Sequence, residues 1–126
     1  MPEIRLSARC FPTEDREKII SGIKSIFPDA EIDGDDPIIA ISSSLDMFAE
    51  LLKKQRIRDA ARRIMRRHIR GQSTSFSLNK QVATVGKISF SEEEHPLGDI
   101  EITIFADELG PLIDIVAPST RPEAGR

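Results

Sequence analysis

The chain has 126 residues, of which 39% are hydrophobic and 31% charged, and this composition excludes a generally disordered protein. The length predicts one domain over residues 1–126. No apolar run approaches the roughly 18 residues of a membrane-spanning helix. The first residues lack the basic and apolar segments of a secretory signal, so we expect a cytoplasmic protein.

The net charge of −3 conceals an uneven distribution of charge along the chain. Residues 53–70 hold nine of the 18 Lys and Arg residues and a single acid, Asp59, so this stretch carries +8 and the remainder −11. Such a basic segment attracts anionic partners, and the net charge alone does not reveal it.

Residues 4–11 alternate between apolar and polar side chains, which predicts a half-buried strand. Cys10 lies on the apolar face of that strand, and we interpret it as a small buried hydrophobe rather than a reactive thiol. A helix is expected to follow with Thr13 as its N-cap and to end before Pro28. Its apolar face is formed by Ile19, Ile20, Ile23, Ile26 and Phe27.

Two strands are predicted over residues 30–33 and 38–42, joined by a turn that contains Asp33, Asp35 and Asp36. This cluster lacks the spaced ligands of a calcium loop, so we interpret it as an acidic turn rather than a cation site. Residues 43–46 resemble a capping box that opens the next helix.

The basic segment is predicted to form the second of two consecutive helices. The apolar stripe of the first helix, Leu45 to Leu52, is rotated by roughly 150° from the stripe that begins at Ile57. We therefore place a break near Gln55. His68 falls on the apolar side, at the edge of the core, and Gly71 is expected to end the helix.

Strands are predicted over residues 76–84, 86–90 and 100–106, followed by a short helix whose first residue is Pro111. Residues 91–96, which include His95, are interpreted as a solvated acidic loop, and residues 118–126 as a frayed tail. The expected order of elements favours an α+β fold: one two-layer domain with a mostly antiparallel sheet and helices packed on one face.

Asn79, Lys80 and Gln81 form a polar group within the predicted 76–84 strand. They are candidates for a hydrogen-bonding patch on the open face of the sheet. Ordinary solvent-facing alternation or a contact between subunits at the sheet edge would equally account for them.

Several segments together resemble the archaeal group known as uncharacterised protein family 0201. They are residues 54–62 (KQRIRDAAR), 76–83 (FSLNKQVA), 86–90 (GKISF), 96–100 (PLGDI) and 113–120 (IDIVAPST). The resemblance covers nearly the whole chain and implies an archaeal source, a homodimer and a fold similar to that of the large-subunit ribosomal protein that binds 5S rRNA. It also implies RNA binding, by fold similarity alone. The arginine-rich run is denser than the family's pattern.

The candidate RNA-binding or anion-binding side chains are arginines on the side of the basic helix opposite Ile57. Guanidinium groups suit bidentate contacts to phosphates, and recognition of an RNA backbone by its shape needs no aromatic side chains. With six Phe and no Tyr or Trp, a protein that stacks single-stranded bases is not favoured. The candidates are Arg56, Arg58, Arg62, Arg63, Arg66 and Arg67.

Other interpretations of the basic helix stay open. Its arginines are also suited to pair with acids of the same chain or of a second subunit, or to lie on another anionic partner or a lipid surface. If RNA is bound, reversing the charge of Arg62 and Arg66 is expected to abolish binding without unfolding the protein. Pairing of the arginines with Asp or Glu would favour a structural role instead.

No enzyme motif is visible, and we expect a binding or structural protein rather than an enzyme. The sequence contains no glycine-rich phosphate loop, and its two His and one Cys do not make a usual zinc site. No cofactor and no small-molecule substrate is therefore predicted.

Overall fold

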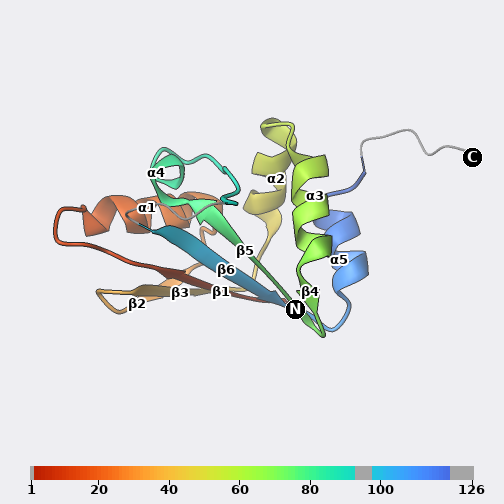
Figure 1. Ribbon diagram of the computed structural model, residues 1–126, viewed down its shortest axis with the longest axis horizontal. Helices are drawn as coiled ribbons and strands as arrows, with labels where there is room; N and C mark the ends of the chain where they lie inside the picture. The colour runs from red at the N-terminus through yellow and green to blue at the C-terminus, as the bar shows by residue number, and fades with distance from the viewer. Residues whose placement is uncertain (1, 93–97, 120–126) are drawn as a thin grey trace, which may run out of the picture.

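The computed structural model describes residues 2–92 and 98–119, and within them an antiparallel sheet carries helices on one side (Figure 1). In chain order the elements are β1 (Glu3–Ala8), α1 (Arg16–Ile26), β2 (Glu31–Asp33), β3 (Ile38–Ser42), α2 (Asp46–Lys54), α3 (Arg58–Arg67), β4 (Ile69–Arg70), β5 (Ser73–Asn79), α4 (Lys80–Ala83), β6 (Asp99–Phe105) and α5 (Leu109–Val116).

The six strands lie in the order β2-β3-β1-β6-β5-β4, and every neighbouring pair is antiparallel. β1 lies near the middle of the sheet, where Ile4 is opposite Ser42 of β3 on one side and Ile104 of β6 on the other. The helices cover the same face of this sheet (Figure 1). The predicted α+β architecture is confirmed.

Alternation along the strands separates a core face from an open face. In β1 the side chains of Ile4, Leu6 and Ala8 are buried, and Ile100, Ile102 and Ile104 of β6 are buried beside them. A line of stacked rings crosses the core, with centroids 5.7 Å apart for Phe27 and Phe48 and 5.8 Å apart for Phe48 and Phe76. This packing fixes the helix layer on the sheet.

The break between α2 and α3 confirms the expected change of helix direction near Gln55. Arg56 adopts a left-handed backbone with φ +60°, its N–H donates to the carbonyl of Lys53, and the N–H of Ile57 donates to the carbonyl of Leu52. These two hydrogen bonds define a Schellman motif. The chain places an arginine where glycine is usual, at a conformational cost of about 1–2 kcal/mol.

Three helix boundaries differ from the sequence prediction. The N-cap of α1 is Asp15 and not Thr13, because the Asp15 carboxylate accepts from the Glu17 N–H at 3.0 Å. The expected capping box does not form at α2, whose N-cap is Leu45, without a side-chain cap. Pro111 is the third residue of α5 rather than the first.

The chain beyond α3 also differs from the prediction. The helix ends at Arg67, and Gly71, with φ +61°, lies in the tight turn between β4 and β5 instead of at the helix end. Residues 86–90 make a single bridge, Phe90 to Leu78, instead of a strand. The reason is that Ile88 exchanges both backbone hydrogen bonds with the Gln55 side chain, each at 2.8 Å.

The strand predicted over residues 76–84 ends at Asn79, so the expected polar patch does not form. Asn79 becomes the N-cap of α4 and accepts from the Val82 N–H at 3.0 Å. Lys80 turns into the protein with 1% of its side chain exposed, while Gln81 lies at the surface. Asn79, Lys80 and Gln81 therefore share no common surface, because the backbone changes from strand to helix between them.

Lys80 makes a buried ion pair that connects α4 to the segment between β1 and α1. Its Nζ donates to Glu14 Oε1 at 2.7 Å and to the Arg9 carbonyl at 2.9 Å, and it lies 5.5 Å from the centre of the Phe11 ring. The Glu14 side chain is also buried, with 6% exposed. Each charge is thus stabilised by the other in a site that excludes water.

Replacing Lys80 with methionine is expected to lower the free energy of unfolding by about 3–5 kcal/mol, because the Glu14 carboxylate is left buried without its cation. The double variant Lys80→Met/Glu14→Gln, which buries no charge at this site, should recover part of the loss. Urea unfolding of the two variants and the wild type measures both values. Equal stability of wild type and Lys80→Met would contradict the role of the ion pair.

Candidate nucleic-acid interface

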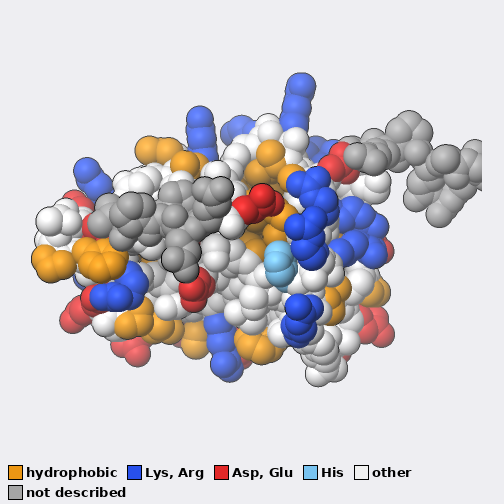
Figure 2. Space-filling view, in the orientation of Figure 1, with side chains coloured by type: hydrophobic (Ala, Val, Ile, Leu, Met, Phe, Trp, Pro, Cys, Tyr) orange, Lys and Arg blue, Asp and Glu red, His pale blue; other side chains and the backbone are white. Residues whose placement is uncertain are grey.

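The basic helix α3 is held to the sheet by its apolar side. Ala61, Ile64 and Met65 are buried, in agreement with the predicted apolar stripe, and the buried Thr74 hydroxyl of β5 donates to the Met65 carbonyl at 2.7 Å. The arginines consequently occupy the remaining circumference of the helix. Figure 2 shows Lys and Arg side chains gathered over the end of the molecule where α3 and α5 lie.

Two of the six candidate arginines are paired within the chain. Asp114 of α5 accepts from Arg62 at 2.6 Å and from Arg66 at 2.9 Å, and Arg62 also donates to the Ala117 carbonyl at 3.3 Å. The two guanidinium groups hold the pKa of the Asp114 carboxyl below its ordinary value of 3.8, chiefly through the hydrogen bond from Arg62. Arg62 and Arg66 thus connect α3 with α5.

The other four candidates make no ion pair with any carboxylate in residues 2–92 or 98–119. Arg63 and Arg67 are exposed and lie one helical turn apart, on the side of α3 away from Asp114. Arg56 lies at the junction of α2 and α3, and Arg58 begins α3. Arg63 and Arg67 therefore form an unpaired side of α3, whereas Arg58, four residues before Arg62, lies without an ion pair on the side that also carries Arg62 and Arg66.

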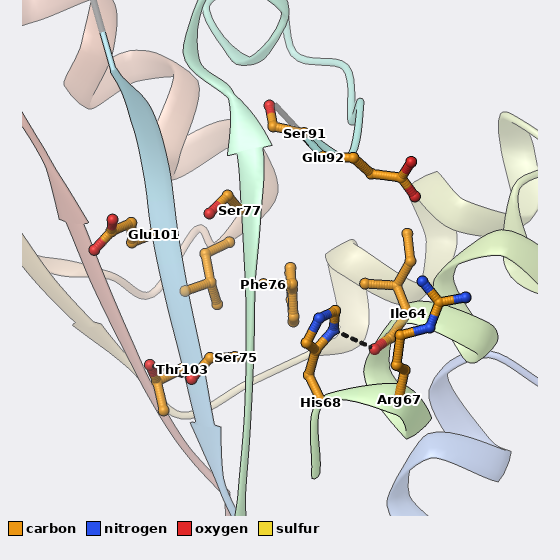
Figure 3. A pocket seen from close by; sticks show the side chains of 11 residues that line it. Ile64, Arg67, His68, Ser75, Phe76, Ser77, Ser91, Glu92, Glu101 and Thr103 are labelled. Carbon is orange, nitrogen blue, oxygen red and sulfur yellow. Dashed lines mark hydrogen bonds between the residues drawn. The ribbon is translucent and has the colours of Figure 1, made fainter. Parts of the chain in front are cut away.

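A cleft of about 560 Å³ opens beside the unpaired side. The cleft forms at the outer edge of β5, because β4 pairs with this edge only as far as Thr74. The next backbone hydrogen bond along the edge is donated by the Ser91 N–H to the Ser77 carbonyl. In Figure 3, His68, the C-cap of α3, faces Phe76 of β5, Arg67 lies beside Ile64, and Glu92 lies above them. The lining residues are Ile64, Arg67, His68, Ser75, Phe76, Ser77, Ser91, Glu92, Glu101, Ile102 and Thr103.

His68 is exposed at this cleft, so its predicted place at the edge of the core is wrong. The helix ends at Arg67, before the expected end at Gly71, so His68 is its C-cap and lies at the surface. Nδ1 lies 2.8 Å from the Ile64 carbonyl and donates to it, because a carbonyl only accepts. This bond leaves Nε2 for a ligand.

Sequence reasoning did not find the functional partners that come from distant segments. Asp114 lies 48 residues beyond Arg66, and Glu92 belongs to the segment that the sequence predicts to be a solvated acidic loop. The remainder of that loop, including His95, lies outside the described residues, as does most of the expected tail. Cys10 is a free, half-buried thiol packed against the core.

Among the described residues no helix is both long enough and apolar enough to cross a membrane. In the same residues, His, Cys, Asp and Glu side chains form no group of three that could hold a metal ion.

Comparison with known proteins identifies the family. Residues 3–106 match a family model described as "RNA binding". A UPF0201 protein of Methanothermobacter thermautotrophicus is 38% identical over 122 residues, which cover 94% of this chain and 92% of that protein. The chain belongs to the archaeal UPF0201 family.

The UPF0201 relatives include a longer protein and solved structures. A UPF0200/UPF0201 protein of Archaeoglobus fulgidus is 37% identical over 94% of this chain, but the chain spans only 38% of that protein. The crystal structure of a UPF0201 protein from Methanococcus jannaschii is 34% identical, covers 94% of this chain and 95% of its own, and superposes with a TM-score of 0.86. The expected likeness to the 5S rRNA-binding ribosomal protein stays a prediction.

Substituting Asp114 with asparagine is expected to lower the melting temperature at neutral pH, because the amide pairs weakly with two guanidinium groups. The pKa of Asp114 is lowered in the folded state, so its contribution is present above 3.8 and disappears as the pH falls through the lowered value. The difference between Asp114→Asn and wild type should therefore shrink in acid.

Thermal unfolding at pH 7 and at acid pH checks this expectation. The control is Asp107→Asn, at an exposed carboxyl without an ion pair in the described residues. A difference for Asp114→Asn that is constant with pH would contradict the assigned pairing.

Proposed function

We propose that this UPF0201 protein binds RNA or a ribonucleoprotein through the unpaired side of α3, recognising the phosphate backbone and the shape of the RNA. The observation that carries the proposal is the set of arginines without an ion pair in the described residues. These are Arg56, Arg58, Arg63 and Arg67. The description of the matching family model supports the same conclusion.

The chemistry of these side chains suits a backbone reader. Guanidinium groups make bidentate contacts with phosphates, and Arg63 and Arg67 lie one helical turn apart on a rigid helix. Stacking on single-stranded bases is not favoured, since Phe27, Phe48 and Phe76 are buried in the core. The proposed role is non-catalytic.

A structural role accounts for the other arginines. Arg62 and Arg66 are both committed to Asp114, as expected if part of the basic helix serves pairing within the chain. Reversing these two charges would place new carboxylates against Asp114 and disturb the packing of α5. Reversing the charges of Arg63 and Arg67 tests RNA binding without disturbing the contact between α3 and α5.

The double variant Arg63→Glu/Arg67→Glu is expected to lose RNA binding while it keeps the wild-type melting temperature. About four phosphate contacts predict a slope near −3 for the logarithm of the association constant against the logarithm of salt concentration. Wild-type affinity should therefore fall by roughly 50-fold between about 50 and 200 mM salt. Filter binding to total archaeal RNA, with circular dichroism of each variant, measures these quantities.

The matched control is Lys18→Glu/Lys24→Glu, which makes the same charge change on exposed residues of α1. It should bind RNA nearly as wild type does. Equal loss in both double variants would indicate a general charge effect and would overturn the assignment to α3. Absence of wild-type binding at about 50 mM salt would overturn RNA binding itself.

We also propose that the protein is a homodimer that pairs through the open face of the sheet. Ile39 and Ile41 of β3 are 38% and 49% exposed on this face, and Phe105 of β6 is 37% exposed. Glu3 and Arg5 lie among them and pair with each other at 2.6 Å within one chain, so a second copy can cover this face without leaving either charge unpaired.

Replacing Ile41 with lysine is expected to shift the protein from the mass of a dimer to that of a monomer in sedimentation equilibrium, because the charge would be buried in the interface. Val85→Lys, at a side chain that is 70% exposed beyond α4, should leave the mass unchanged. A wild-type protein that sediments as a monomer at micromolar concentration would overturn the dimer.

A further inference from the structure

The cleft at the edge of β5 carries opposite charges on two of its walls. Arg67 belongs to the α3 wall, whereas Glu92 belongs to the segment that follows Phe90 (Figure 3). A second carboxylate, Glu101 of β6, lines the cleft where it continues toward the open face of the sheet. Within the described residues neither Arg67 nor Glu92 makes an ion pair. A ligand that fits these walls has an anionic group at one end and hydrogen-bond donors at the other.

Between these walls the cleft offers apolar and hydroxyl groups. Ile64 and Phe76 contribute a small apolar surface, and Ser75, Ser77 and Thr103 lie where the cleft continues around β5 toward the open face of the sheet (Figure 3). The volume of about 560 Å³ falls in the range of roughly 300–1,000 Å³ that encloses small ligands. A nucleotide has the matching parts: a phosphate, a flat base and sugar hydroxyls.

We propose that this cleft receives one unpaired nucleotide of the bound RNA, an inference that rests on the proposed RNA-binding function. Arg67 belongs both to the unpaired side of α3 and to the cleft wall, so the RNA backbone that follows α3 reaches the cleft mouth at this residue. Arg67 binds the phosphate of the inserted nucleotide, and His68 Nε2, which accepts when Nδ1 carries the ring proton, accepts a hydrogen bond from a sugar hydroxyl. The base lies in the cleft against the small exposed parts of Ile64 and Phe76, which are 7% and 6% exposed, and does not stack between them.

Glu92 determines which base is accepted. A carboxylate only accepts hydrogen bonds, so it selects a base edge that presents donors. Guanine presents two neighbouring donors, N1–H and the N2 amino group, and can bond both carboxylate oxygens. Uracil presents one N–H between two carbonyl oxygens, which repel the carboxylate. The cleft therefore favours guanosine over uridine.

The discriminating experiment compares three RNA hairpins with the same stem: fully paired, with one bulged guanosine, and with one bulged uridine. Fluorescence anisotropy gives the dissociation constant of each hairpin with wild type, Glu92→Gln and a control, Glu108→Gln, which removes an exposed carboxylate outside the cleft. The ratio of the two bulged constants is the readout, because a general change of charge affects both hairpins alike.

Wild type is expected to bind the guanosine bulge about tenfold more tightly than the uridine bulge, the discrimination of one good bidentate pair. Glu92→Gln should bring the ratio close to one, and Glu108→Gln should keep it. Binding of all three hairpins with a wild-type ratio of one, or with a ratio that Glu92→Gln leaves unchanged, overturns the cleft and leaves the arginine face standing. Binding of none at about 50 mM salt overturns both proposals.

Discussion

Burial on one face of the sheet is the constraint on which the rest of the structure depends. Because β1 and β6 alternate strictly, their isoleucines and Leu6 all point toward the helices, and the opposite face stays polar apart from a few side chains. The helices α1, α2, α3 and α5 lie on this face, where α3 contacts α2, α5 and β5 and keeps the rest of its circumference at the surface (Figure 1).

Electrostatics then divides the basic helix. Arg62 and Arg66 are four residues apart, a spacing at which like charges repel by a few tenths of a kcal/mol. A shared carboxylate on α5 offsets this repulsion and leads both guanidinium groups toward the neighbouring helix. Arg63 and Arg67 have no such partner in the described residues. Asp114 thus determines which arginines of this basic helix are paired and which are left for a partner.

The sequence predicts the architecture well where periodicity is long and regular. The apolar stripe rotates along the sequence because α2 and α3 bury different sides against the core. This rotation correctly predicts the break between α2 and α3. Prediction fails where a single side chain changes its role. Lys80 would continue a strand by its spacing, but its ion pair with the distant Glu14 places it inside the protein, where the backbone has turned into a helix.

For the candidate site, the sequence predicts the arginines but not the acidic residues that lie near them. The arginines can be recognised because they are neighbours in sequence. The fold alone brings Asp114 to Arg62 and places Glu92 in the same cleft as Arg67. The cleft arises because β4 has two residues and leaves part of the β5 edge uncovered. Strand pairing of that length depends on packing throughout the domain and leaves little local signal.

The position of β1 in the sheet has a consequence for the synthesis of the protein. Residues 3–8 are synthesised about 90 residues before β6, at residues 99–105, which is one of the two strands that flank them. Until β6 emerges, β1 has an open edge and the buried face of the sheet lacks Ile100, Ile102 and Ile104. The middle of the sheet thus closes only after residue 105 has left the ribosome, and this long-range pair delays folding.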